Sequence, residues 1–154
     1  MPTTETAQVL ESWPQPGTGN AGPRIRTGNR SLVVAYPLPS EEVAVVEFPV
    51  CVQLTYGQPN DEALQSHPLY GKGLKFYSVH RIHNSSKLAA LERANSVHPQ
   101  HDAATFIKNR HYYVFTFQDA TLECVVLAGD GLAPKIQVVP SWAEANAALA
   151  QSAA

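Results

Sequence analysis

Several short segments of the chain alternate between apolar and polar residues, which is the pattern of a β-strand with one buried face. The alternation is clearest after Pro49, where every second position is apolar or aromatic. Pro49 itself interrupts the segment 43–56, and because proline cannot donate a backbone hydrogen bond, we expect a bulge or an edge position there. Strands are predicted at 31–37, 43–56, 74–83, 111–128 and 135–139, and the fourth of these segments is a hairpin of two strands.

The hairpin segment 111–128 carries apolar patterns on both strands, and together these patterns predict a register. With a turn at Asp119–Ala120, or with a four-residue loop of the same register, Phe115 faces Cys124 and Thr116 faces Glu123. The turn lacks the glycine that tight hairpins prefer, so the hydrophobic pattern alone supports this register.

Helices are indicated by capping residues at the starts of three further segments. Asn84 or Ser85 precedes a helix that runs to about Asn95, and Pro99 prevents its continuation. A second helix within 101–110 has Asp102 as its cap and Phe106 and Ile107 as its anchors, and Ser141 with Glu144 forms a capping box for a C-terminal helix. One further helical turn is predicted at 61–65, capped by Asn60 and ended by His67 and Pro68.

These elements predict an α+β fold with a strongly bent, mostly antiparallel sheet or open barrel of about six strands and two or three short helices. Strands and helices do not alternate, which disfavours a parallel, doubly wound sheet. Because prolines and glycines are frequent in residues 1–30, we expect an irregular N-terminal arm there and a single domain over residues 31–154. Trp13 is an exception in this arm, and we expect it to dock on the domain or on a second subunit.

Composition narrows the class of partner. The chain has 154 residues, 44% of them hydrophobic, and a formal net charge of −2. This charge argues against a nucleic-acid-binding surface, and the run Arg24, Arg26 and Arg30 is interpreted as a solvated linker. No stretch is long and apolar enough for a membrane span and no signal peptide is recognisable, so a cytoplasmic location is expected, with Cys51 and Cys124 as buried thiols.

Four of the six histidines fall between positions 79 and 101 and raise the question of a metal site. His80 and His83 would point to opposite faces of one strand, and a helix separates them from His98 and His101. The remaining pair, His98-x-x-His101, is a weak alternative metal site, because this spacing is common and zinc requires more ligands. We expect no metal and no cofactor.

His80 and Glu123 are the candidate functional residues. His80 shares the apolar face of its strand with Phe76 and Ile82, so it is either a core histidine bonded to the backbone or a pocket histidine. Glu123 lies between apolar neighbours and is either solvent-exposed or part of a polar floor with Thr116. If both faced one cavity, they would form an acid–base pair with perturbed pKa values.

No standard catalytic motif is present, so the sequence favours a small binding or accessory domain over an enzyme. It would hold a small apolar ligand or a protein partner on its curved sheet. The alternative is a small cofactor-free enzyme in which His80 and Glu123 act as acid and base. A homodimer through the N-terminal arm is a further hypothesis. The expected ligand-binding residues are Phe76, His80, Tyr113, Phe115, Thr116 and Glu123.

Overall fold

The structure is a computed structural model that describes residues 4–18 and 22–152. The strands are β1 (Thr6–Val9), β2 (Arg24–Thr27), β3 (Leu32–Pro37), β4 (Val43–Phe48), β5 (Cys51–Gly57), β6 (Val79–His83), β7 (Arg110–Thr116), β8 (Thr121–Leu127) and β9 (Lys135–Val139). The helices are the 3₁₀ helix η1 (Asp61–Ser66) and the α-helices α1 (Ser86–Asn95), α2 (Ala103–Lys108) and α3 (Trp142–Ser152). Within the described ranges, no helix has the length and apolar character needed to cross a membrane.

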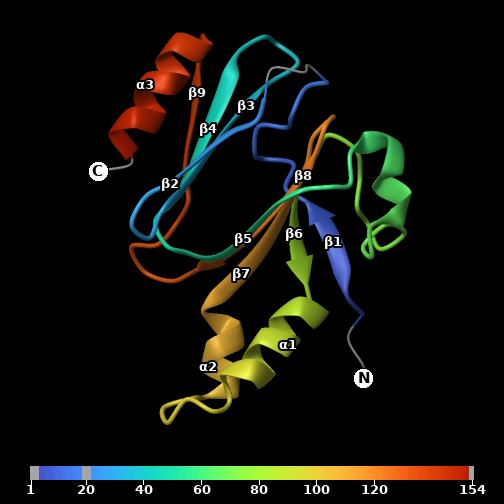
Figure 1. Cartoon of the computed structure of the whole chain (residues 1–154), viewed down its shortest axis with the longest axis vertical. Coiled ribbons are helices and arrows are strands. Elements are labelled where there is room, and N and C mark those ends of the chain that lie inside the picture. The colour runs from blue at the N-terminus through green and yellow to red at the C-terminus, as the bar shows by residue number, and fades with distance from the viewer. Residues whose placement is uncertain (1–3, 19–21, 153–154) are drawn as a thin grey trace.

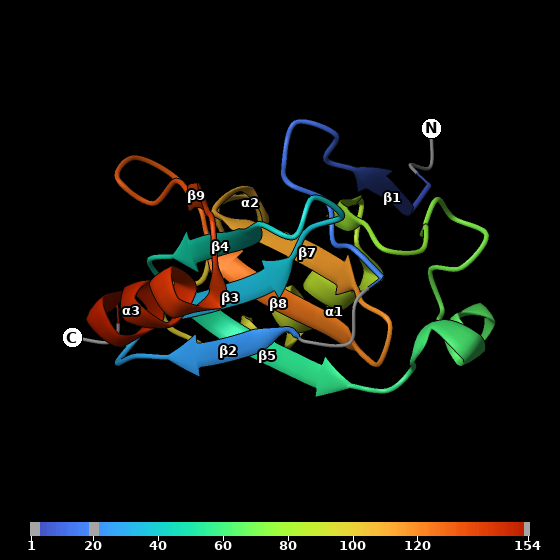
Figure 2. The same ribbon diagram turned by 90° about the horizontal axis from the view of Figure 1, so that it is seen from above.

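The strands form two antiparallel sheets that pack face to face (Figures 1 and 2). One sheet has five strands in the order β1-β6-β7-β8-β5, and the other has four in the order β2-β3-β4-β9. A single core joins them, in which Tyr36 and Phe48 of the second sheet meet Phe115 and Leu122 of the first. The α+β class and the antiparallel pairing are therefore confirmed. The single bent sheet or open barrel is not, because the strands divide between two sheets and close no barrel.

Helices cover the outer face of each sheet, as Figure 1 shows. Ala145 and Leu149 of α3 pack on Val33 and Val45 of the four-stranded sheet, which explains why β3 and β4 are apolar on both faces. Over the five-stranded sheet, Leu88 of α1 shares a second cluster with residues of the segment 58–75. The N-caps Asn60, Ser85 and Asp102 are those that the sequence predicts.

Pro49 lies at the point where the chain leaves one sheet for the other. The segment 43–56, expected to be one interrupted strand, is in fact two strands: β4 pairs with β3 and β9, whereas β5 pairs with β8. A proline at this corner costs no ladder hydrogen bond, because neither strand continues through it.

The N-terminal arm is not irregular as expected, because it contributes edge strands to both sheets: β1 pairs with β6 and β2 with β3. Between these strands, the Trp13 ring lies against Phe48 and Tyr113, with ring centroids 6.2 and 5.3 Å away. Trp13 therefore docks on its own domain. The basic run is likewise not a linker, since Arg24 and Arg26 belong to β2.

Three further local expectations need correction. The segment 74–83 becomes a strand only at Val79, because Tyr77 adopts a φ of +49° that ends the extended backbone. The hairpin turn lies one residue earlier than predicted, so Phe115 faces Leu122 and Val114, not Thr116, faces Glu123. Ile107 is not an anchor of α2, because 41% of its surface is exposed.

Candidate functional site

His80 lies on the outer face of the five-stranded sheet and is completely buried. The backbone N–H of Lys75 donates to Nε2 at 2.9 Å, so Nε2 is unprotonated and Nδ1–H donates to the carbonyl oxygen of Val114 at 3.0 Å. Both ring nitrogens are therefore occupied by backbone groups. The histidine ties the segment before β6 to β7 and offers no free nitrogen to a ligand.

The neutral state of His80 can be tested by titration. Burial lowers the pKa of His80, and the nearby His67 and Lys75 lower it further, although the bond to Val114 acts in the opposite direction. We expect long-range ¹H–¹⁵N NMR spectra to show the neutral Nδ1–H tautomer of His80 still present at pH 6, where an ordinary histidine is mostly protonated. Protonation of His80 near pH 6.5 would contradict the buried geometry.

Glu123 does not face His80, because Val114 lies between them in the register of β6, β7 and β8. Its histidine partner is His67, whose Nε2 lies 3.1 Å from the Glu123 carboxylate. The other carboxylate oxygen accepts a hydrogen bond from the hydroxyl of Tyr112. The Lys87 ammonium group lies 4.0 Å from the same oxygen and above the Tyr112 ring.

These groups hold Glu123 in its ionised form. Burial by itself raises the pKa of Glu123, but the hydrogen bonds from His67 and Tyr112 and the charge of Lys87 outweigh burial and bring this pKa below its ordinary value. Burial and the bond to Glu123 raise the pKa of Tyr112 far above the physiological range. Tyr112 is therefore a permanent hydrogen-bond donor and supplies no phenolate nucleophile.

The cluster lines a cavity of about 220 Å³ at the N-terminal end of α1. His67 cannot exchange a proton there without breaking a bond, because its Nδ1 accepts the backbone N–H of Leu69 at 3.0 Å and its Nε2 is bonded to Glu123. Glu5, on the same cavity wall, accepts the N–H and hydroxyl of Ser86 and pairs with Lys72. Among the charged side chains that line the cavity, Lys87 has the longest ion-pair distance, 4.0 Å to the Glu123 carboxylate. The cluster thus joins the segment 58–75 to the sheet and leaves one ammonium facing the cavity.

The remaining predicted ligand-binding residues are dispersed. Phe115 and Thr116 are buried in the protein, where the Thr116 hydroxyl is bonded to backbone groups of Lys75 and Ser78. Tyr113 borders a separate cavity of about 240 Å³, and Phe76 is 44% exposed beside another. Among the five cavities described for residues 4–18 and 22–152, none is lined by two of the six predicted residues.

The side chain of His98 is bonded within its own loop, and the side chain of His101 is bonded to α1. His98 Nδ1 accepts the backbone N–H of Gln100, and His101 lies 2.7 Å from the Glu92 carboxylate and 2.8 Å from the Asn95 amide. Among residues 4–18 and 22–152, no group of three or more histidine, cysteine or acidic side chains is placed to hold a metal ion.

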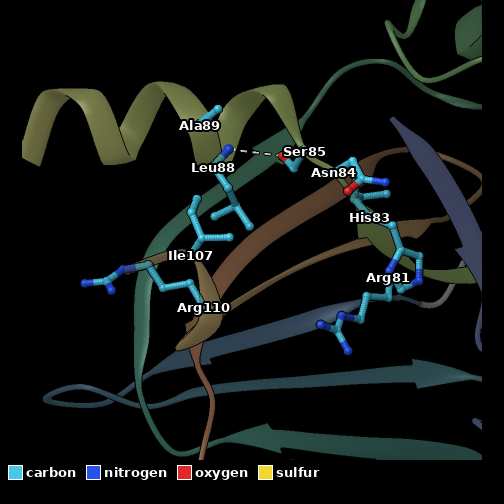
Figure 3. A pocket seen from close by; sticks show the side chains of 9 residues that line it. Arg81, His83, Asn84, Ser85, Leu88, Ala89, Ile107 and Arg110 are labelled. Atoms are coloured by element: carbon cyan, nitrogen blue, oxygen red, sulfur yellow. Dashed lines mark hydrogen bonds between the residues drawn. The ribbon is translucent and has the colours of Figure 1, made fainter. Parts of the chain in front are cut away.

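Two arrangements could not be recognised in the sequence. His67 and Tyr112 join Glu123 from positions 56 and 11 residues away, with no spacing that marks them. Arg81 and Arg110 border a cavity of about 340 Å³ between α1, α2 and the adjoining ends of β6 and β7 (Figure 3). The two arginines are 29 residues apart in the sequence, and no spacing marks them as neighbours.

Comparison of the chain with protein-family models, with curated proteins and with solved structures finds no match.

Proposed function

We propose that the chain is a non-catalytic binding domain that receives an extended segment of another protein at the edge strand β5. The observation that carries this proposal is that β5, an edge strand of the five-stranded sheet, is exposed and has no charged residue. β5 pairs only with β8, and 48% of the surface of both Val52 and Tyr56 is exposed. Unprotected edge strands with apolar side chains can accept a further strand, whose backbone hydrogen bonds supply much of the binding energy.

The other sheet edges are less suited to such pairing. Gly73 and Lys72 cover β1, since the Ala7 N–H already donates to the Lys72 carbonyl oxygen. β2 is only four residues long and carries two arginines, and β9 begins with a lysine. Charge and covering are the usual ways in which proteins protect sheet edges. Of the four edges, β5 is the longest and the only one without a charged residue or a covering segment among the described residues.

A groove beside β5 adds side-chain recognition. It measures about 320 Å³, and Val52, Leu91 and Phe106 contribute its apolar walls. The first residue of β5 is already engaged, because Cys51 N–H donates to the Arg30 carbonyl oxygen, and a bulge follows at Val52. Pairing would therefore extend along Gln53–Gly57, and an apolar side chain of the partner would enter the groove.

The alternative of a cofactor-free enzyme is less well supported. An acid–base pair needs at least one group that can exchange a proton with substrate. Both ring nitrogens of His67 and of His80 are hydrogen-bonded within the protein, and Glu123 is held ionised by two donors. A small apolar ligand on the sheet is also less well supported, since the facing sheet surfaces are filled by the common core.

The free thiols Cys51 and Cys124 agree with the proposed cytoplasmic location.

Site-specific photo-cross-linking in the cells that produce the protein tests the proposal. A photoreactive phenylalanine analogue at Tyr56 should give a discrete adduct with a second protein, and the substitution Gln53→Lys should reduce it. The same analogue at Val138, which is 44% exposed in β9 at an edge of the other sheet, is the matched control. Equal labelling at positions 56 and 138 would refute β5 docking.

Sedimentation velocity of the purified chain separates the two kinds of occupant. We expect a monomer at all concentrations, because the proposed partner is another protein. A dimer that Tyr56→Glu abolishes would show that the occupant is a second copy of this chain. A dimer that survives Tyr56→Glu would instead support pairing through another surface, such as the N-terminal arm.

A further inference from the structure

The cavity shown in Figure 3 contains positive charge without a matching acid. Arg81 borders it from β6 together with His83, and Arg110 borders it from the start of β7 with its guanidinium group turned away from Arg81 in Figure 3. None of its lining residues is acidic. The full lining is Arg81, Ile82, His83, Asn84, Ser85, Leu88, Ala89, Ile107 and Arg110.

The cavity exists because two neighbouring strands separate. The paired residues of β6 and β7 run from Val79 with Phe115 to Arg81 with Tyr113, and no pair joins Ile82 or His83 to β7. The chain between these strand ends forms α1 and α2, which pack on each other, and Figure 3 shows α1 above the cavity. The cavity thus lies where the backbones of β6 and β7 are no longer paired.

Arg81 has an unmet hydrogen-bonding requirement. Its Nε atom is buried and has no hydrogen-bond partner, the sole side-chain nitrogen or oxygen in that situation among the described residues. Neither Arg81 nor Arg110 forms an ion pair with an acidic side chain in the described ranges. The stretches outside these ranges contain no aspartate or glutamate. Buried donors are normally satisfied, so the hydrogen bonding of Arg81 is incomplete within the described chain, and its guanidinium group is the one at this cavity that still lacks an acceptor.

Nearby groups support a positive potential at this place. Burial lowers the pKa of His111, and the charges of Arg81 and His83 lower it further. Arg110 is partly engaged already, because it donates to the Phe106 carbonyl oxygen at 3.3 Å and stacks on the Phe106 ring. The N-terminus of α1 is not the anion site, since Glu5 already accepts the Ser86 N–H. Arg81 is therefore the group best placed to receive an anion.

The rest of the cavity wall is apolar. Leu88 and Ile107 face each other between α1 and α2 in Figure 3, and Ile107 keeps 41% of its surface exposed. A guanidinium group binds a carboxylate through two parallel hydrogen bonds, one of which can come from Nε. An exposed apolar wall favours an aliphatic body in the same ligand.

We propose that this cavity binds a small organic anion, with its carboxylate at the Arg81 guanidinium and its aliphatic chain against Leu88 and Ile107. The site adjoins the groove beside β5, with which it shares Arg110, and goes beyond the protein-binding function proposed above. Inorganic phosphate shares the charge but lacks the chain, so it distinguishes simple anion binding from recognition of an organic acid.

Isothermal titration calorimetry with sodium octanoate, 1-octanol and inorganic phosphate tests the site on the full chain. Octanoate should bind, and both other probes should bind about tenfold more weakly or not at all, because each lacks one half of the contacts. Arg81→Met should weaken octanoate binding by about tenfold or more. The matched control Arg26→Met removes one exposed arginine of β2 and should leave the affinity unchanged.

A structural role for Arg81 predicts a different result. In the ligand-free protein the unpaired donor of Arg81 costs stability. If Arg81 serves to bind a ligand, Arg81→Met should therefore keep or raise the melting temperature of the ligand-free protein while it lowers the affinity for octanoate. Equal binding of octanoate and 1-octanol, equal or tighter binding of phosphate, or unchanged affinity in Arg81→Met would overturn the proposal. Should Arg81→Met fail to fold, the Arg81 Nε–H resonance of the unmodified protein must shift on addition of octanoate, and its constancy would overturn the proposal equally.

Discussion

Replacing Glu123 by alanine should lower the free energy of unfolding by about 3 kcal/mol, since it leaves buried donors without their acceptor. The two donors are the Nε2–H of His67 and the hydroxyl of Tyr112. His67 is almost completely buried, so water cannot replace the lost carboxylate at low cost. Urea unfolding followed by circular dichroism measures the change.

Two controls separate this effect from a general loss of charge. Glu62→Ala removes an exposed carboxylate from η1, in the same segment as His67, and should change stability by less than about 0.5 kcal/mol. Glu123→Gln keeps the shape and one acceptor oxygen and should fall between the two. If Glu123→Ala were as mild as Glu62→Ala, the cluster would not be what joins the segment 58–75 to the sheet.

The same carboxylate predicts a pH dependence with a definite sign. The folded-state pKa of Glu123 lies below its ordinary value of 4.5, so the unfolded chain binds the proton more tightly than the folded chain does. The stabilisation by Glu123 is therefore complete above about pH 4.5 and is lost as the pH falls through the folded-state pKa. The acid-induced loss of stability should be smaller in Glu123→Gln than in the unmodified protein.

Local signals in the sequence predicted local structure well. Ser85 caps α1 through a side-chain bond to Leu88 N–H, and Asp102 and Asn60 cap the helices after them, because a cap acts over three residues. The strands beyond residue 30 were also predictable, since alternation is a property of neighbouring positions, whereas β1 and β2 of the arm were not. The C-terminal helix, which its capping box predicts, packs on the four-stranded sheet through Ala145 and Leu149.

The hairpin register depended on contacts that no local pattern contains. The turn comprises Gln118 and Asp119, and the Gln118 carbonyl oxygen accepts the N–H of Asp61 from η1. The Thr121 hydroxyl donates to the Pro59 carbonyl oxygen. The segment 58–66 thus holds the turn one residue earlier than the hydrophobic pattern predicts. The pattern could not distinguish the two registers, because both keep the same side chains on each face of the hairpin.

The same limitation applies to the candidate site. Alternation placed His80 on the apolar face of β6 and Glu123 on one face of β8, but it cannot say which segment covers that face. The covering segment 58–75 brings His67 to Glu123, whereas Val114 keeps His80 away. The sequence also did not predict that the strands divide into two sheets. Pro49 is compatible both with a bulge in one strand and with a corner between two sheets.

Replacing Gly73 by alanine should destabilise the protein by about 3 kcal/mol, through backbone strain and a steric clash together. Gly73 has a φ of +109°, and an added Cβ would overlap the carbonyl oxygen of Ala7 in β1. The clash is with backbone, so no rotamer change can relieve it. β1 would have to move away from the loop that covers it, and its bond from Ala7 N–H to the Lys72 carbonyl oxygen would break.

Gly71 provides a matched control two residues away. It also has a positive φ, of +86°, but an added Cβ would meet nothing within 4 Å. Gly71→Ala should therefore show the backbone strain alone, about 1 kcal/mol, and leave β1 in place. Hydrogen exchange at the Ala7 amide reports the difference, because Gly73→Ala should accelerate this exchange strongly and Gly71→Ala only in proportion to its smaller loss of stability. If Gly71→Ala and Gly73→Ala lost the same stability, β1 could move away from the covering loop without an energetic penalty. β1 would then be, like β5, an edge open to a partner strand.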